Sequence, residues 1–330
     1  MHTGRMDVTS ERVPLTRVPL SDAPRPPLDT TRLPWPGEHV EAGGVRLHIR
    51  RTPGPADETA VYVHGLGGSS KNWTDLAAQL SLHAQGIAVD LPGAGQSEPP
   101  AGYRFDLADH VETLAKFMRG LDHGPVHLFG NSMGGAVSML LAARHPDLVK
   151  TLTLVSPAVP DLRPFPNRMS DPRIPFAMLP FVGSRFRRQL AALTPMQRAH
   201  QLVKLCFANP SLVPPHRMEE TAAEFAERAK IAWAAQALMA TTLGLFRAWL
   251  VPPSQSLWRI VPQITAPTLV IWGAEDKLVT VRKAPRTARL LPRGRLLVLP
   301  RTGHVAQMER PETVARAALG LFEAERNGTW

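Results

Sequence analysis

Short apolar runs alternate with amphipathic stretches along two parts of this chain of 330 residues. The runs are rich in β-branched residues and are typical of parallel strands buried on both faces. The stretches between them carry apolar residues at helical spacing. The alternation predicts an α/β fold, with a mostly parallel central sheet and helices on both faces. The expected elements are a hairpin over 40–51 turning at Gly43-Gly44, strands at 60–63, 87–89, 126–129, 152–155, 268–272 and 296–299, and helices at 73–80, 107–121, 133–144, 283–291 and 311–325.

The alternation stops in the middle of the chain, over residues 157–262. This segment holds many prolines and helical patterns but no convincing strand, and Met218, Ala222, Phe225, Ala229 and Trp233 fall near helical spacing. It therefore predicts a helical insertion that follows a strand end, where α/β proteins place their ligand sites.

The ends of the chain complete the expected domain organisation. Residues 1–37 are rich in proline and arginine with little periodicity, so we expect a disordered or extended tail. Residues 38–156 and 263–330 would then form one α/β core around the insertion.

The cysteine count and the apolar segments indicate the compartment in which the protein works. Cys206 is the single cysteine, which excludes an internal disulfide and fits a reducing, cytoplasmic compartment. No basic and then apolar signal segment opens the chain. Residues 231–246 carry no charge but are short for a membrane span of roughly 20 residues, so we expect a buried helix without stable membrane insertion.

The formal net charge of +10 lies largely in the insertion, which has 13 Lys and Arg against 6 Asp and Glu. Arg185, Arg187 and Arg188 are candidates for meeting an anionic substrate, although a solvated helix face is the simpler interpretation. No zinc-ligand spacing or RNA-binding signature is present, so nucleic-acid binding is not expected. The sequence leaves the oligomeric state open.

The stretch Gly130-Asn131-Ser132-Met133-Gly134 lies between a predicted strand and a predicted helix. A serine hydroxyl is a poor nucleophile and must project clear of the backbone toward a base. A tight, strained turn achieves this, and the flanking glycines let strand and helix approach closely. Ser132 is therefore the candidate nucleophile.

A base and an acid should follow the serine, each after a later strand. Asp276 follows the strand expected at 268–272, and His304 follows the strand expected at 296–299. Asp276 would orient the imidazole of His304, which would take the proton of the serine. Glu275 is expected to face away, and Asp161, after an earlier strand, is the alternative acid.

The same chemistry needs backbone N–H groups directed at a developing oxyanion. One is expected from Met133, the residue after the nucleophile. The other is expected from Leu66, in the glycine-rich loop His64-Gly65-Leu66-Gly67-Gly68-Ser69 after an earlier strand. We interpret His64 as a residue that organises this loop and not as a second base.

Together these residues resemble the α/β-hydrolase fold superfamily over about 38–330. The resemblance rests on His64-Gly65, the loop from Asp90 to Ser97, the turn at Ser132, Trp272-Gly273-Ala274-Glu275-Asp276 and Gly303-His304, in that order. It implies that residues 157–262 form a cap, or lid, over the site, and that Asp90 has a structural role. A serine at the turn separates the chain from related dehalogenases and epoxide hydrolases, which use aspartate there.

Asn131 is the residue at which resemblance to esterases and resemblance to carbon–carbon hydrolases differ. Many esterases of the family have histidine at this position, whereas Gly-Asn-Ser-x-Gly-Gly resembles the carbon–carbon hydrolases that cleave ring-fission products of aromatic compounds, as does Ala306-Gln307. Those enzymes typically have Pro-Gly in the oxyanion loop, where this chain has Gly68-Ser69, and tryptophan at the position of Val305. Plain variation at Asn131 is an equally good interpretation.

The expected function is a serine hydrolase, without metal or organic cofactor, acting on a small carboxylic ester or related acyl compound. Many Met, Phe and Trp side chains in the cap suit an apolar acyl or aryl group, and Asn131, Val305 and Trp233 are the candidates for the substrate pocket. The alternatives are carbon–carbon hydrolysis of a vinylogous diketo acid, and a binding protein or acyltransferase on the same fold.

Overall fold

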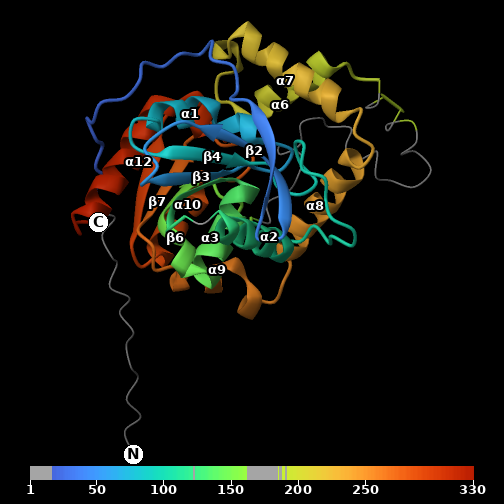
Figure 1. Ribbon diagram of the computed structural model, residues 1–330. Helices are drawn as coiled ribbons and strands as arrows, with labels where there is room; N and C mark the ends of the chain where they lie inside the picture. Colours follow the sequence, from blue (N-terminus) through green and yellow to red (C-terminus); the bar gives the residue numbers. More distant parts are fainter. Residues whose placement is uncertain (1–16, 122, 162–184, 186–187, 190–191) are drawn as a thin grey trace, which may run out of the picture.

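A computed structural model describes residues 17–121, 123–161, 185, 188–189 and 192–330 (Figure 1). Its centre is an 8-stranded sheet in the order β1-β2-β4-β3-β5-β6-β7-β8. β2 runs antiparallel to both of its neighbours, and all other pairs are parallel. The expected α/β fold is confirmed. The strands are β1 (Gly37–Ala42), β2 (Val45–Thr52), β3 (Thr59–Val63), β4 (Gln85–Val89), β5 (Val126–Asn131), β6 (Val149–Val155), β7 (Thr268–Gly273) and β8 (Gly294–Leu299).

Helices cover both faces of the sheet, because residues alternate between its two sides. In β7, Val270 and Trp272 join one apolar cluster and Leu269 and Ile271 join the other. In Figure 1, α1 and α12 lie on one side of the sheet and α2, α3 and α9 on the other. The helices outside the expected cap are α1 (Thr74–Leu80), α2 (Leu107–Gly120), α3 (Met133–Arg144), α10 (Ala284–Leu290), α11 (Ala306–Glu309) and α12 (Pro311–Arg326). Helix α9 (Leu257–Ile260) belongs to the segment expected to form the cap but packs against α3 of the core.

Helices α6 (Pro195–Cys206), α7 (Pro215–Arg228) and α8 (Ala234–Trp249) lie in the segment expected to form the cap. α6 packs against α7, and α8 lies beside α2 (Figure 1). Helix α7 ends at Arg228, so the helical spacing that we extended to Trp233 covers α7 and the turn that leads to α8.

The uncharged segment around α8 is only half buried, contrary to the expectation of a buried helix. Ala237 and Leu245 face the core, whereas Met239 and Leu243 are exposed. Within the described part of the chain, no helix is both long and apolar enough to cross a bilayer.

Residues 17–36 form neither helix nor strand and run along α1, α12 and α7. Ser21 N–H donates to Arg316 O at 3.0 Å, Gln79 Nε2 donates to Pro26 O at 2.7 Å, and His216 Nε2 lies 2.6 Å from Thr30 O. The rest of the predicted tail lies outside the described residues.

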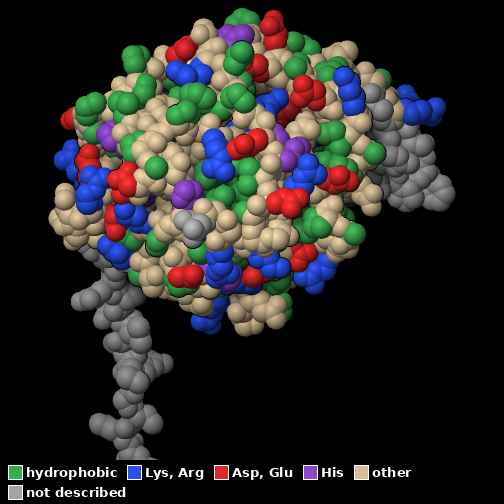
Figure 2. All heavy atoms as spheres, viewed as in Figure 1, with side chains coloured by type: hydrophobic (Ala, Val, Ile, Leu, Met, Phe, Trp, Pro, Cys, Tyr) green, Lys and Arg blue, Asp and Glu red, His purple; other side chains and the backbone are tan. Residues whose placement is uncertain are grey.

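Basic residues do not gather into one patch on the face seen in Figure 2, where Lys and Arg are interspersed with Asp and Glu. Arg185 and Arg188 are exposed, and Arg187 lies outside the described residues. The observed charges therefore resemble a solvated surface on this side of the molecule.

The strand order reverses between β3 and β5, which are adjacent and parallel, with Val63 opposite Gly130. Ligand sites of open α/β sheets form at such a point, beyond the carboxyl ends of the strands. The loops after β3, β5, β7 and β8 meet at this edge, and they carry Leu66, Ser132, Asp276 and His304.

Candidate active site

Ser132 stands in a strained turn between β5 and α3. Its backbone has φ 54° and ψ −118°, a conformation that costs energy for a residue with a side chain. A Cβ on Gly134 would lie 2.2 Å from Val63 O, and a Cβ on Gly130 would lie 2.5 Å from Gly134 O. Both flanking positions therefore need glycine, as expected for a turn that presents a nucleophile.

His304 and Asp276 meet at the same edge of the sheet. His304 Nδ1 lies 2.9 Å from Asp276 Oδ2, and their side chains are 5% and 0% exposed. The other oxygen of Asp276 accepts the N–H groups of Leu278 and Val279 at 2.8 and 2.9 Å. A carboxylate held in this way favours the tautomer with the proton on Nδ1, which leaves Nε2 able to accept a proton.

Asn131 links the histidine to the serine turn. Its Nδ2 donates to Val155 O at 3.0 Å and to His304 O at 3.1 Å, and its side chain is buried. The described residues record no hydrogen bond between the Ser132 hydroxyl and His304, and such bonds often form only in the complex with substrate. The amide of Asn131 therefore serves to hold the histidine loop beside the turn.

The two other acidic candidates occupy different surroundings. Glu275 is exposed, as expected for a side chain that faces away. Asp161 is buried and accepts the Thr280 N–H at 3.2 Å, so it lies against the loop of Asp276. It is Asp276 that contacts the imidazole of His304.

The glycine-rich loop after β3 lies against the serine turn. A Cβ on Gly65 would lie 3.1 Å from Ser132 Cβ, a tight contact that shows how closely the loop approaches the turn. Met133 is the first residue of α3, and its N–H has no acceptor within the helix. Leu66 and Met133, the two residues expected to supply oxyanion donors, line the same pocket.

The cap reaches this loop through Arg228, at the end of α7. Its guanidinium donates to Gly67 O at 2.7 Å and pairs with Glu224 at 3.1 Å. Sequence analysis missed this contact, because nothing in a helical arginine indicates which distant carbonyl it reaches.

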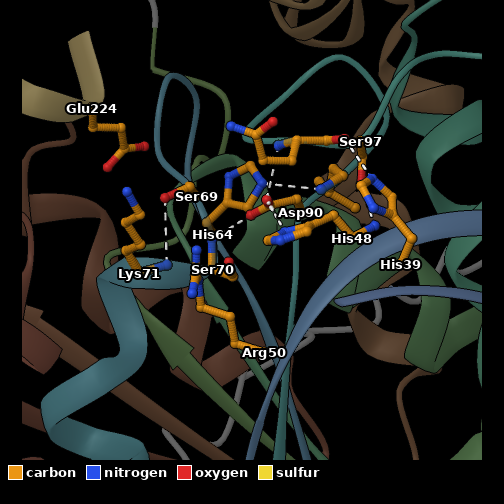
Figure 3. A network of polar contacts seen from close by, with 12 residues as sticks. His39, His48, Arg50, His64, Ser69, Ser70, Lys71, Asp90, Ser97 and Glu224 are labelled. Carbon is orange, nitrogen blue, oxygen red and sulfur yellow. Dashed lines mark hydrogen bonds and ion pairs between the residues drawn. The ribbon is translucent and has the colours of Figure 1, made fainter. Parts of the chain in front are cut away.

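A network of buried polar side chains contacts the glycine-rich loop (Figure 3). His64 Nε2 accepts the Leu91 N–H at 3.1 Å, and its Nδ1 lies 2.7 Å from Gly65 O. Burial lowers the pKa of His64, which fits a neutral imidazole that joins two loops. These contacts agree with its interpretation as a loop-organising residue.

Asp90 is the centre of the same network (Figure 3). Its carboxylate lies 2.7 Å from His48 Nδ1 and accepts the N–H groups of Ser70 and Gln96 at 2.6 and 3.0 Å. Burial alone would raise the pKa of Asp90, but these hydrogen bonds outweigh it and bring the pKa to about 2. The carboxylate thus joins β2, the 3-10 turn that precedes α1 and the loop after β4, which is a structural role.

The end of α6 is fastened to the histidine loop, a feature absent from the sequence analysis. Cys206 O accepts the His304 N–H at 2.7 Å. The Glu309 carboxylate accepts the N–H groups of Gly303 and Ala208 at 2.7 and 3.2 Å. The catalytic candidate His304 is therefore positioned from the cap as well as from the core.

The pocket lined by Leu66 and Met133 is open to solvent, and the free space in and around it measures about 340 Å³. Of the predicted pocket residues, the half-buried Trp233 and the buried Asn131 and Val305 are not among its described lining, whereas Ala234 is. In the described part of the chain, no three His, Cys, Asp or Glu side chains are grouped to hold a metal ion.

Comparisons with known proteins agree with this geometry. The family model for the alpha/beta hydrolase fold matches residues 61–311. The chain is 31% identical over 285 residues to the dihydrolipoyllysine-residue acetyltransferase component of an acetoin cleaving system from Pseudomonas putida, covering 86% of this chain and 69% of that protein.

Two further relatives are named as hydrolases. Lipase 1 of Psychrobacter immobilis is 24% identical over 290 residues, covering 86% of this chain and 84% of the lipase. The 2-hydroxy-6-oxononadienedioate/2-hydroxy-6-oxononatrienedioate hydrolase of Cupriavidus pinatubonensis is 27% identical over 286 residues, covering 84% and 90%. With the family model spanning most of the sheet, the chain belongs to the α/β-hydrolase fold family and is a hydrolase enzyme.

Proposed function

We propose that this protein is a serine hydrolase of carboxylic esters or related acyl compounds that carry an apolar acyl or aryl group. The observation that carries the proposal is that a strained Ser132, with φ 54°, lies at the same sheet edge as a buried imidazole whose Nδ1 is 2.9 Å from Asp276 Oδ2. A nucleophile, a base and a group that orients the base are the parts that acyl transfer to serine requires.

The proposed reaction has two halves. Ser132 Oγ attacks the ester carbonyl carbon while His304 Nε2 takes its proton, and the N–H groups of Leu66 and Met133 stabilise the oxyanion. Collapse expels the alcohol, which receives the proton from His304. Water, deprotonated by His304, then attacks the acyl carbon, and His304 returns the proton to Ser132 Oγ as the carboxylic acid leaves.

The proposed acyl pocket lies between the core and α8. Leu66, Leu91, Met133 and Leu238 supply its apolar lining. This lining supports a substrate with an apolar portion.

The test is hydrolysis of aryl esters of graded acyl length by the wild-type chain and by Ser132→Ala. We expect turnover by the wild type and a loss of at least about 10³-fold in kcat in the variant. Thermal unfolding at the wild-type temperature would show that the variant is folded. Activity retained by folded Ser132→Ala would overturn the proposal.

Carbon–carbon hydrolysis is the second candidate, supported by the relative named for ring-fission substrates, 27% identical over 286 residues. The same assay decides between the two candidates when a vinylogous diketo acid is added to the panel. Carbon–carbon cleavage would be favoured if this compound, followed by the loss of its dienol absorbance, is turned over faster than any ester of the panel.

Transfer of the acyl group is a third candidate, supported by the relative named as an acetyltransferase component, 31% identical over 285 residues. In that case an added alcohol or thiol would intercept the acyl-enzyme. Product analysis would show the transferred ester or thioester at the expense of the free acid.

A further inference from the structure

The proposed acyl pocket is lined by polar as well as apolar side chains, and one of the polar ones is a second histidine besides His64. His110, in the first turn of α2, lines the pocket together with Leu66, Met133 and Leu238. It is 1% exposed, so it is part of the pocket wall and not of the outer surface. A histidine in such a wall demands an explanation, because a polar group buried without a partner is costly.

Among the described residues, one nitrogen of the His110 ring has a hydrogen-bond partner and the other has none. Nδ1 lies 2.9 Å from the hydroxyl oxygen of Tyr103, and the two rings meet edge to face with centroids 5.4 Å apart. Nε2 is buried and has no hydrogen-bond partner among the described residues. Such a group typically costs about 1–3 kcal/mol, which a ligand atom of matching polarity would recover.

The His110 ring is neutral at physiological pH. Burial, reinforced by the neighbouring His64, lowers the pKa of His110 to about 3. A neutral imidazole offers an anion no charge attraction, so an uncharged polar group is the better match. Whichever nitrogen carries the proton, a hydroxyl suits Nε2, because a hydroxyl both donates and accepts.

We propose that the acyl group of the natural substrate bears a hydroxyl, and that His110 Nε2 forms a hydrogen bond with it inside the pocket. This inference rests on the proposed ester hydrolysis and narrows its substrate class to hydroxyacyl esters. His110 is then a specificity-determining residue, since it contacts the acyl group away from the reacting carbonyl.

The experiment compares ethyl hexanoate with its isomers that carry one hydroxyl at each successive chain carbon, measured by proton release. For the wild type we expect at least one hydroxylated ester to exceed the plain ester in kcat/KM by about 10- to 100-fold, the gain of one satisfied buried hydrogen bond. In His110→Phe, which fills a similar volume without a polar atom, that ratio should fall to within about twofold of unity.

His110→Gln is the second variant, for use if His110→Phe does not fold. Its amide keeps a polar group in the buried pocket wall. It should keep part of the preference. A wild type without preference for any hydroxylated isomer would overturn the inference, as would an unchanged preference in folded His110→Phe. Turnover of the plain ester in those cases would leave ester hydrolysis standing, whereas no turnover of any ester would overturn both proposals.

Discussion

Replacing Asn131 tests how the histidine is held at the serine turn. Its Nδ2 makes buried hydrogen bonds of 3.0 and 3.1 Å to Val155 O and His304 O. In Asn131→Ala, Val155 O keeps the Ser132 N–H at 3.0 Å, whereas His304 O loses the partner recorded for it. One buried carbonyl without a partner costs about 1–3 kcal/mol, so the melting temperature should fall by several degrees.

The effect on activity should exceed the effect on stability. The lost bond fixes the backbone of His304 itself, and a displacement of about 1 Å in a catalytic group can cost about 10²-fold in rate. We expect kcat for aryl ester hydrolysis to fall by about 10- to 100-fold with KM nearly unchanged. Asn131→Asp should be worse, because it directs carboxylate oxygens at two carbonyl oxygens.

Gln79→Ala is the matched control for Asn131→Ala. Gln79 is also buried, and its Nε2 donates to Pro26 O at 2.7 Å, away from the serine turn. This variant should lose comparable stability and keep the wild-type kcat. Two results would refute the reasoning: an Asn131→Ala kcat within twofold of the wild type, or a raised KM at unchanged kcat, which would make Asn131 a substrate contact.

Three further variants test the turn, the cap contact and a buried histidine. Gly134→Ala places a Cβ 2.2 Å from Val63 O and should abolish activity and lower the unfolding temperature, whereas Gly124→Ala, with open space around its Cβ, should match the wild type in both assays. Arg228→Ala removes the 2.7 Å bond to Gly67 O and should lower kcat about 10-fold, since a hydrogen bond from a charged group contributes about 1.5–3 kcal/mol; an unchanged kcat would show that the loop holds itself. Burial lowers the pKa of His127 to about 4, below its ordinary value near 6.5, so the folded chain favours the neutral imidazole. Above pH ~6.5 the ring is neutral in both states, and the free energy of unfolding falls as the pH drops from there toward 4, because the unfolded chain takes up the proton first. The free energy of unfolding from urea titrations should drop by about 2 kcal/mol less between pH 7 and 5 in His127→Gln than in the wild type, and equal drops would contradict this account.

The sequence predicted the α/β core well, because apolar runs and helical spacing report on burial at the level of single elements. The strand expected at 126–129 is observed as Val126–Asn131, and the helix expected at 133–144 is observed with those bounds. The half-buried state of α8 could not be predicted, because an uncharged segment indicates how apolar a helix is and not which side it buries.

For the candidate site, too, the sequence predicted some residues and not others. The order along the chain and the positions after strand ends predicted Ser132, Asp276 and His304 as candidates, since catalytic groups of this architecture follow particular strands. The roles of Glu309, Arg228 and His110 depend on contacts between segments far apart in the sequence, such as the 2.7 Å bond from Arg228 to Gly67 O. No local pattern encodes such a contact, and only the packed chain reveals it.

The central claim is that Ser132 is the nucleophile of an acyl-enzyme. Its most direct test is the intact mass of the protein after reaction with a fluorophosphonate, followed by peptide mapping. The account predicts one adduct per chain, located on Ser132 and absent from Ser132→Ala. An unmodified wild-type chain, or an adduct on another residue, would contradict it.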